Sequence, residues 1–274
     1  MCLIALAHRV HPEFPLVVAA NRDEFYGRPT TAASFWQDQP SILAGRDLEG
    51  MGTWLGVTRT GRFAAVTNYR DSEDRRSSAE SRGALVRRFL SEDISAAGFL
   101  QEIAPTADAY RGFNLLISDG EEFYSYSNRS GDPIRLEPGI YGLSNHLLDT
   151  PWRKVKLARE RLREALNPVP AMEPMFSLLD DTSVAAPNEL PTTGVSSERE
   201  RMLSAARIVS DTYGTRCSTV VMQKSEGTVR FAERTYGPQG AELDTVRYEF
   251  RKIGLTPIGL TPSGFTPSGF TPSG

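Results

Sequence analysis

Cysteine is nearly absent from this chain, because Cys2 and Cys217 are the only two among 274 residues. They could form one bridge at most, whereas secreted domains that depend on disulfides are small and rich in cysteine. The chain also lacks the basic leader, apolar segment and cleavage site of a secretory signal. No run approaches the ~20 apolar residues of a membrane span. The composition therefore predicts a cytoplasmic protein without a transmembrane segment.

An excess of charge of one sign is lacking as well. The chain has 31 basic and 34 acidic residues and a formal net charge of −3, so no basic face for nucleic acid is expected. The three histidines, His8, His11 and His146, have no further ligand at a spacing typical of metal sites. No Cys-x-x-Cys, P-loop, Gly-x-Gly-x-x-Gly or Gly-x-Ser-x-Gly pattern occurs. We therefore expect no nucleic-acid partner, no metal and no cofactor, and a small molecule as substrate or ligand.

The sequence does contain alternating groups of strands and helices. Apolar stretches predict buried strands, glycine-containing turns predict hairpins, and capping boxes at 77–80 and 197–200 predict helix starts. Residues 30–50 and 167–195 are expected to be irregular, with Phe35 and Trp36 as core anchors. The expected strands are 3–7, 16–20, 53–57, 62–68, 113–119, 122–127, 134–145, 216–223 and 228–236, and the expected helices are 83–90, 94–104, 151–165 and 197–209.

This order of elements favours an α+β fold in which helices cover antiparallel sheets. It is compatible with a four-layer α/β/β/α sandwich formed by a single domain over residues 1–253. Residues 254–274 differ, because they repeat Gly-Leu/Phe-Thr-Pro-Ser with small variations. Regular proline and glycine prevent a helix and interrupt a strand ladder, so we expect a disordered tail without a role in the chemistry.

Cys2 is the first candidate for chemistry. It follows the initiator methionine, and removal of a methionine before such a small residue is usual. Cys2 would then carry a thiol and a free α-amine on one carbon, so that a nucleophile and its general base share a residue. The alternative is a small buried residue near the start of a strand.

A dense polar cluster, residues 21–24, follows the second apolar strand. If the first two strands form a hairpin, this cluster lies close to Cys2, because the hairpin returns the chain to its start. Arg22 could then hold the thiolate or a substrate carboxylate, and Asp23 could orient the α-ammonium group. The alternative is a surface turn with several ion pairs.

Two asparagines, Asn68 and Asn145, each follow a predicted strand. A pre-oriented amide is a good donor to an oxyanion, and one such donor is worth roughly 3 kcal/mol. An Asx turn at the strand end is the alternative for both residues. Arg216 precedes a strand and could add positive charge to the same site, or it could be a surface residue.

Short motifs follow one another in a fixed order across residues 1–236: Met1-Cys2, Ala20-Asn21-Arg22-Asp23-Glu24-Phe25 with Arg28-Pro29, Gly52-Thr53-Trp54-Leu55-Gly56, Thr67-Asn68-Tyr69-Arg70, Ser81-Arg82-Gly83 with Leu85-Val86, Gly142-Leu143-Ser144-Asn145, Leu190-Pro191 with Thr193-Gly194, and Tyr213-Gly214-Thr215-Arg216. Together they resemble the NRDE family, which is named for the tetrapeptide at 21–24 and includes the eukaryotic transport-and-Golgi-organisation proteins.

That family is similar in turn to N-terminal-nucleophile (Ntn) hydrolases of the penicillin V acylase and bile-salt hydrolase type. The resemblance implies an Ntn-hydrolase-like sandwich, with Cys2 as nucleophile and Asn68 and Asn145 at the oxyanion site. Those hydrolases place an arginine and an aspartate three residues apart, whereas Arg22 and Asp23 are adjacent here. Members of the family are also linked to haem or lipid trafficking.

Two functions follow as hypotheses. The first is an Ntn-type hydrolase or acyltransferase that cleaves a small amide or thioester through Cys2. The second is a carrier on the same fold that binds haem, acyl-CoA or another acyl lipid and cleaves no bond. The sequence leaves the substrate and the oligomeric state open.

Overall fold

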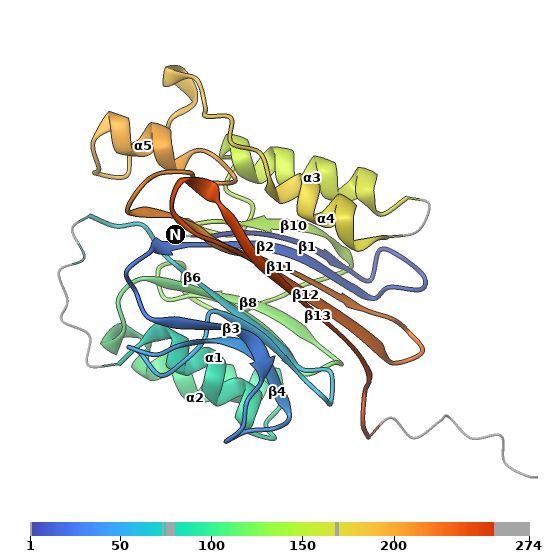
Figure 1. Ribbon diagram of the computed structural model, residues 1–274. Helices are drawn as coiled ribbons and strands as arrows, with labels where there is room; N and C mark the ends of the chain where they lie inside the picture. The colour runs from blue at the N-terminus through green and yellow to red at the C-terminus, as the bar shows by residue number, and fades with distance from the viewer. Residues whose placement is uncertain (1, 73, 75–79, 168–169, 255–274) are drawn as a thin grey trace, which may run out of the picture.

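Two antiparallel sheets lie face to face, and helices cover both outer sides (Figure 1). The computed structural model describes residues 2–72, 74, 80–167 and 170–254. The first sheet contains β1 (Cys2–His8), β2 (Leu16–Phe25), β10 (Gly139–Leu143), β11 (Tyr213–Gln223), β12 (Thr228–Tyr236) and β13 (Glu242–Arg251), in the order β10-β1-β2-β11-β12-β13. The second sheet contains β3 (Thr30–Phe35), β4 (Ile42–Asp47), β5 (Leu55–Thr58), β6 (Phe63–Asn68), β7 (Phe113–Ser118), β8 (Phe123–Ser127) and β9 (Ile134–Arg135), in sequence order.

The helices form the two outer layers. On the second sheet lie α1 (Arg82–Ser91) and α2 (Ala96–Ile103), which continues into the 3-10 helix η1 (Ala104–Ala109). On the first sheet lie α3 (Arg153–Ala165) and α4 (Met172–Leu179). The remaining helices are α5 (Ser197–Leu203), η2 (Pro187–Glu189) and η3 (Pro238–Gly240). The α+β prediction and the four-layer α/β/β/α sandwich are confirmed.

The central strands are apolar throughout because both of their faces are buried. Successive side chains of a strand point to opposite faces, and β1 shows the result. Ile4 and Leu6 pack against the other sheet, whereas Leu3, Ala5 and Ala7 pack beneath α3 and α4. A strand of this kind has no polar face, so its sequence reads as one continuous apolar run.

Both segments that were expected to be irregular contain regular elements, so the prediction is wrong for residues 30–35, 42–47 and 172–179. Residues 30–50 form β3 and β4, because the backbone N–H of Ala33 finds an acceptor in the buried Glu233 and the run from Ile42 to Ala44 is buried on both faces. The segment 167–195 contains α4. Its Pro174 lies in the first helical turn, where a missing N–H costs no helical hydrogen bond.

Two strand predictions also need correction. The expected strand 134–145 is divided between the sheets, since β9 pairs with β8 and β10 pairs with β1. The chain crosses from one sheet to the other between Arg135 and Gly139. No strand was expected at 242–251, yet β13 forms there, with Val246, Tyr248 and Phe250 packed against the core between the sheets.

Part of the predicted organisation lies outside the described residues. This holds for the repeat tail after Gly254 and for most of the capping box at 77–80. In the ranges that the structure describes, no helix is both long and apolar enough to cross a membrane.

A close backbone contact joins the start of β5 to α1. The backbone N–H of Thr53 donates to the Gly83 carbonyl oxygen at 3.2 Å, and a Cβ on Gly52 would lie 2.4 Å from the Gly83 carbonyl carbon. Relief of this contact would require the backbone at Gly52 or at Gly83 to move. We therefore expect Gly52→Ala to lower the free energy of unfolding by about 2 kcal/mol. Urea denaturation measures the loss. Gly27→Ala is the control, because a Cβ at Gly27 meets no atom within 4 Å, and an equal loss in both variants would contradict the argument.

A buried histidine at the end of β1 gives the fold a pH dependence. His8 is 7% exposed, and burial, aided by the nearby Arg9, lowers its pKa from 6.5 to about 4. The unfolded chain binds a proton at His8 more readily than the folded chain does, so protonation of His8 favours unfolding. The stability is therefore fully present above pH 6.5 and falls by roughly 3 kcal/mol in all as the pH decreases towards 4. We expect His8→Gln to remove this part of the slope in unfolding titrations from pH 4 to 7. Parallel profiles for the two proteins would refute the assignment.

Candidate active site

The hairpin of β1 and β2 brings Cys2 and the polar cluster together, as the sequence predicted. Cys2 is paired directly with Arg22 in the antiparallel register, and Arg22 is paired on its other side with Cys217 of β11. Directly paired residues have their side chains on the same face of a sheet. Cys2 and Arg22 therefore face the second sheet together, because Ile4 and Ala20 of the same strands do so.

Arg22 and Asp23 face opposite sides of β2, since they are consecutive residues of one strand. The Arg22 guanidinium lies between the sheets, 4.2 Å above the Trp54 ring. Asp23 is buried on the helix side, where its Oδ1 accepts a hydrogen bond from Thr215 Oγ1 at 2.7 Å. Burial raises the pKa of Asp23, although the amino-terminal charge and Lys154 oppose this shift. Arg22 and Asp23 therefore lie in two different environments, Arg22 between the two sheets and Asp23 between the first sheet and its helices.

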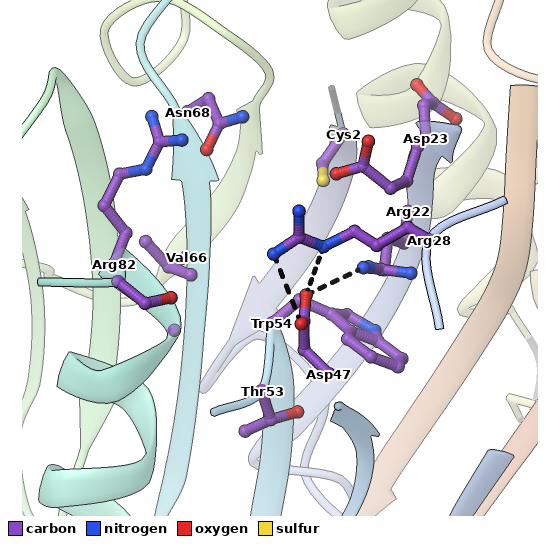
Figure 2. Close-up of a pocket in the computed structure, with 13 residues that line it drawn as sticks. Cys2, Arg22, Asp23, Arg28, Asp47, Thr53, Trp54, Val66, Asn68 and Arg82 are labelled. Atoms are coloured by element: carbon purple, nitrogen blue, oxygen red, sulfur yellow. Dashed lines mark hydrogen bonds and ion pairs between the residues drawn. The ribbon is translucent and has the colours of Figure 1, made fainter. Parts of the chain in front are cut away.

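An ion-pair cluster holds Arg22 on the cleft side. Asp47 at the end of β4 accepts from Arg28 Nε at 2.6 Å and Nη2 at 3.2 Å, and it lies 3.4 Å from Arg22 Nη2. Burial alone would raise the pKa of Asp47, but the hydrogen bonds from Arg28 and from the Gly50 N–H lower it. The carboxylate stays ionised and fixes both guanidinium groups beside Cys2 (Figure 2).

The Cys2 thiol is half-buried, and neither Cys2 nor Cys217 is in a disulfide. Burial raises the pKa of the Cys2 thiol, the amino-terminal charge and Arg22 act to lower it, and Asp23 acts to raise it. A thiol whose pKa is raised is mostly protonated near neutral pH, so an attack by this sulfur needs a base that removes its proton.

Asn145 holds the backbone of Cys2. The Asn145 side chain is fully buried, and its Oδ1 accepts from the Cys2 backbone nitrogen at 3.3 Å. Its Nδ2 donates to the Asn68 carbonyl oxygen at 2.9 Å, which connects the first sheet to the end of β6. Ser144 Oγ donates to the Cys2 carbonyl oxygen at 2.8 Å. Asn145 therefore fixes the position of Cys2, in addition to any role as an oxyanion donor.

Arg216, for which the sequence left a site role and a surface position open, is not among the residues that line the cleft with Cys2. It is the extra residue of a bulge in β11, where the register with β2 shifts between Thr215 and Cys217. Its Nη1 donates to the carbonyl oxygens of Phe25 at 2.8 Å and Arg28 at 3.0 Å. Because the guanidinium is engaged there, Arg216 fixes the chain that follows β2.

The cleft at Cys2 is a small polar compartment beside a larger one. The small compartment has a volume of about 130 Å³ and is lined by Cys2, Arg22, Asp23, Trp54, Asn68 and Arg82, among others. Figure 2 shows the Cys2 sulfur turned into the space between Arg22 and β6, which carries Asn68. The larger compartment has a volume of about 520 Å³ and shares Glu24, Arg28, Asn68 and Arg82 with the small one. Small-molecule sites have volumes of about 300–1,000 Å³, so a ligand of that size would need both compartments.

Among the described residues no group of three histidine, cysteine, aspartate or glutamate side chains is placed to hold a metal ion. Of the residue types that bind haem iron, Cys2 lines the small compartment and Tyr69 and Tyr213 line the larger one.

Several lining residues were not singled out for chemistry from the sequence. Arg28, Trp54 and Arg82 lie within the family motifs, so the signal was present without an assigned role. Asp47 carried no signal, because its segment was expected to be irregular; in the structure it is the last residue of β4, paired with Thr30 of β3, and it lines the cleft.

The fold and this site define a class of protein: an α/β/β/α sandwich with a cysteine at the start of a central strand, in a polar cleft between its two sheets. The chain belongs to the Transport and Golgi organisation 2 family, whose family model matches residues 1–238. The resemblance read from the motifs is confirmed.

Curated relatives match this chain over most of their length. The chain is 35% identical over 274 residues to the Transport and Golgi organization protein 2 homolog of Homo sapiens, covering 91% of this chain and 99% of that protein. It is 34% identical to the Bos taurus homolog, with 92% and 99% covered, and 25% identical to the Drosophila melanogaster protein, with 86% and 92% covered. Among solved structures, it is similar to the Caenorhabditis elegans N-acylethanolamine-hydrolyzing acid amidase ortholog, with a TM-score of 0.44, 11% identity, and 80% of this chain and 92% of that chain covered.

Proposed function

We propose that this protein is a cysteine hydrolase or acyltransferase of the Ntn type that acts on a small amide or thioester through Cys2. The observation that supports it most directly is the position of the Cys2 nitrogen, 3.3 Å from Asn145 Oδ1, while the thiol lies in the cleft beside Arg22. Removal of Met1 would turn that nitrogen into an α-amine, held by the same acceptor. We also propose the cytoplasm as the compartment, because thiols are kept reduced there.

The chemistry then takes place on one residue. The neutral α-amine takes the proton of the Cys2 thiol, directly or through one water, and the thiolate sulfur forms a bond to the carbonyl carbon. The resulting α-ammonium returns the proton to the leaving amine as the C–N bond breaks, which leaves a thioester on Cys2. Water or an acceptor amine, deprotonated by the same α-amine, then attacks the thioester and restores the thiol.

The surrounding residues have separate roles in this scheme. Arg22 stabilises the thiolate by its charge, and Asp47 keeps Arg22 in place. Asn145 orients the α-amine through Oδ1, and the second hydrogen of its Nδ2 and the side chain of Asn68 are the candidate oxyanion donors. Asp23, on the opposite face of β2, stabilises the α-ammonium form by its negative charge.

Alkylation tests the nucleophile directly. We expect iodoacetamide to label Cys2, which lines the cleft, and to spare Cys217, which is 3% exposed and whose thiol pKa burial raises well above its usual value. Peptide mass mapping locates the label, and intact mass shows whether Met1 is removed. Loss of turnover on a panel of amides in proportion to the labelling of Cys2 supports the proposal, whereas an unlabelled Cys2 or full turnover after labelling argues against it.

A non-catalytic carrier of haem or an acyl lipid is the second candidate. It is favoured by the volume of the larger compartment, because a ligand bound there need not reach Cys2. Saturable binding of haem or acyl-CoA that persists in Cys2→Ala, without turnover by the wild type, would support this function. The absence of such binding would remove it.

A further inference from the structure

The larger compartment carries more arginines than acidic residues. Its lining includes five arginines, and its acidic residues are Glu24, Asp71 and Asp74. Two of the three acids are already engaged, because Arg129 Nη2 lies 2.5 Å from Asp74 and 3.6 Å from Asp71. Arg129, which is not among the lining residues, therefore balances part of the negative charge of these two carboxylates.

Two of the five arginines are neutralised outside the compartment. Arg28 pairs with Asp47, which lines the small compartment and not the larger one. Arg70 pairs with Glu200 at 2.5 Å in a buried ion pair. In both pairs a carboxylate already compensates the charge of the guanidinium, so these two arginines add little net positive charge to the wall.

Arg82 and Arg199 differ from these arginines, because neither forms an ion pair within the described ranges of the chain. Arg82, the first residue of α1, donates from Nη1 to the Gly112 carbonyl oxygen at 3.2 Å. Arg199 belongs to α5, so the two residues come from the helix layers on opposite sides of the sandwich (Figure 1). Both line the larger compartment, and Arg82 lines the compartment of Cys2 as well.

A cationic wall without enough counter-charge favours an anion. Burial, and next the charge of Arg111, lower the pKa of Arg82, although the charges of Asp74 and Glu24 oppose this shift. Arginine binds carboxylate and phosphate oxygens through charge-assisted, often bidentate hydrogen bonds. An anion bound at Arg82 would offset the repulsion between Arg82 and Arg111.

We propose that the larger compartment binds an anionic group, a carboxylate or a phosphate, of the molecule whose carbonyl group reaches Cys2, and that Arg82 and Arg199 recognise this group. The inference rests on the proposed function in one respect, which is that the carbonyl group of the ligand lies at Cys2. It assigns the substrate class as small acyl compounds that carry a negative charge beyond the scissile bond. Arg82 lies between the compartments, so it recognises a charge close to the reacting carbonyl.

Binding to the full chain with Cys2→Ala tests this inference without requiring catalysis. The probes are N-phenylacetylglycine, its neutral analogue N-phenylacetylglycinamide, and N-phenylacetyl-aminomethylphosphonate, each titrated by calorimetry at low and high salt. We expect both anions to bind about tenfold more tightly than the neutral amide, because a hydrogen bond to a charged group is worth that much or more. The tighter of the two anions identifies carboxylate or phosphate as the preferred group.

Arg82→Gln and Arg199→Gln, each made in the Cys2→Ala chain, are expected to reduce that preference to about threefold or less and to leave the affinity for the neutral amide unchanged. Arg87→Gln, on the same helix α1 but outside both compartments, is the matched control and should keep the preference. Equal affinity for all three probes, no binding of any probe, or an equal effect of Arg87→Gln would overturn the inference. A failure of wild-type turnover with these anions binding normally would instead count against the proposed function alone.

Discussion

Cys2→Ala is expected to abolish amide or thioester turnover, with a loss of about 10⁴-fold or more in kcat. The expected loss is this large because the variant lacks the nucleophile, and knocking out one member of a catalytic unit costs nearly as much as removing the unit. The fold should persist, since alanine fills the same half-buried position at the start of β1. Initial rates on the best substrate of an amide panel measure the effect, with circular dichroism to confirm folding.

The control for this prediction is Cys217→Ala, which removes the other thiol from the row Cys2–Arg22–Cys217 and should retain most of the turnover. A chain with an uncleaved extension before Cys2 gives a second comparison. It keeps the thiol and converts the α-amine into a peptide N–H, so we expect a loss of about 10²–10⁴-fold, the usual worth of general base catalysis. Equal rates for the extended and the processed chains would show that the α-amine is not the base.

The strands could be predicted from the sequence where the pattern of apolar residues matches the burial of the strand. β1, β2 and the hairpin of β5 and β6 follow from apolar runs and turns, because strands buried on both faces contain few polar residues. β3 was missed because Ala33 is its only buried residue, while Thr31, Ala32 and Ser34 are exposed, so that it lacks the apolar run of the central strands. β13 was missed although Val246, Tyr248 and Phe250 alternate as a half-buried strand requires.

The candidate site was predictable only as far as local pairing reaches. The meeting of Cys2 and Arg22 follows from the return of one hairpin. Asp47 and Arg82 reach the cleft through contacts between the two sheets and their helix layers, which no local pattern encodes. The role of Asn145 could not be predicted from the sequence either, because an amide at a strand end can donate to a ligand or form hydrogen bonds to the backbone. In the structure both the oxygen and the nitrogen of the amide form hydrogen bonds to backbone groups.

The adjacency of Arg22 and Asp23 acquires a physical meaning in the fold. Two residues on one strand serve the two faces of the sheet, so Arg22 reaches the thiol side and Asp23 the helix side. On the helix side, burial lowers the pKa of Lys154 to about 8, and the charge of Asp23 opposes this shift.

The buried pair of Arg70 and Glu200 supports the second large prediction. Glu200 is 3% exposed and also accepts from the backbone N–H of Thr193 at 3.0 Å, so it joins the segment after β6 to the chain before α5. We expect Glu200→Gln to lower the free energy of unfolding by about 3–5 kcal/mol, because the variant removes the buried carboxylate that pairs with the Arg70 charge. Urea denaturation at pH 7 measures the loss.

The matched control for Glu200→Gln is Glu198→Gln, an exposed carboxylate in the first turn of the same helix, for which we expect a change within about 0.5 kcal/mol.

The double variant Arg70→Met with Glu200→Leu removes both charges of the pair. We expect it to be less destabilised than the sum of the two single variants, because the cost of each single variant comes from the buried charge that has lost its counter-charge. Additive losses would show that the two side chains stabilise the fold independently. The buried ion pair would then not be the link that connects the cleft to the α5 layer.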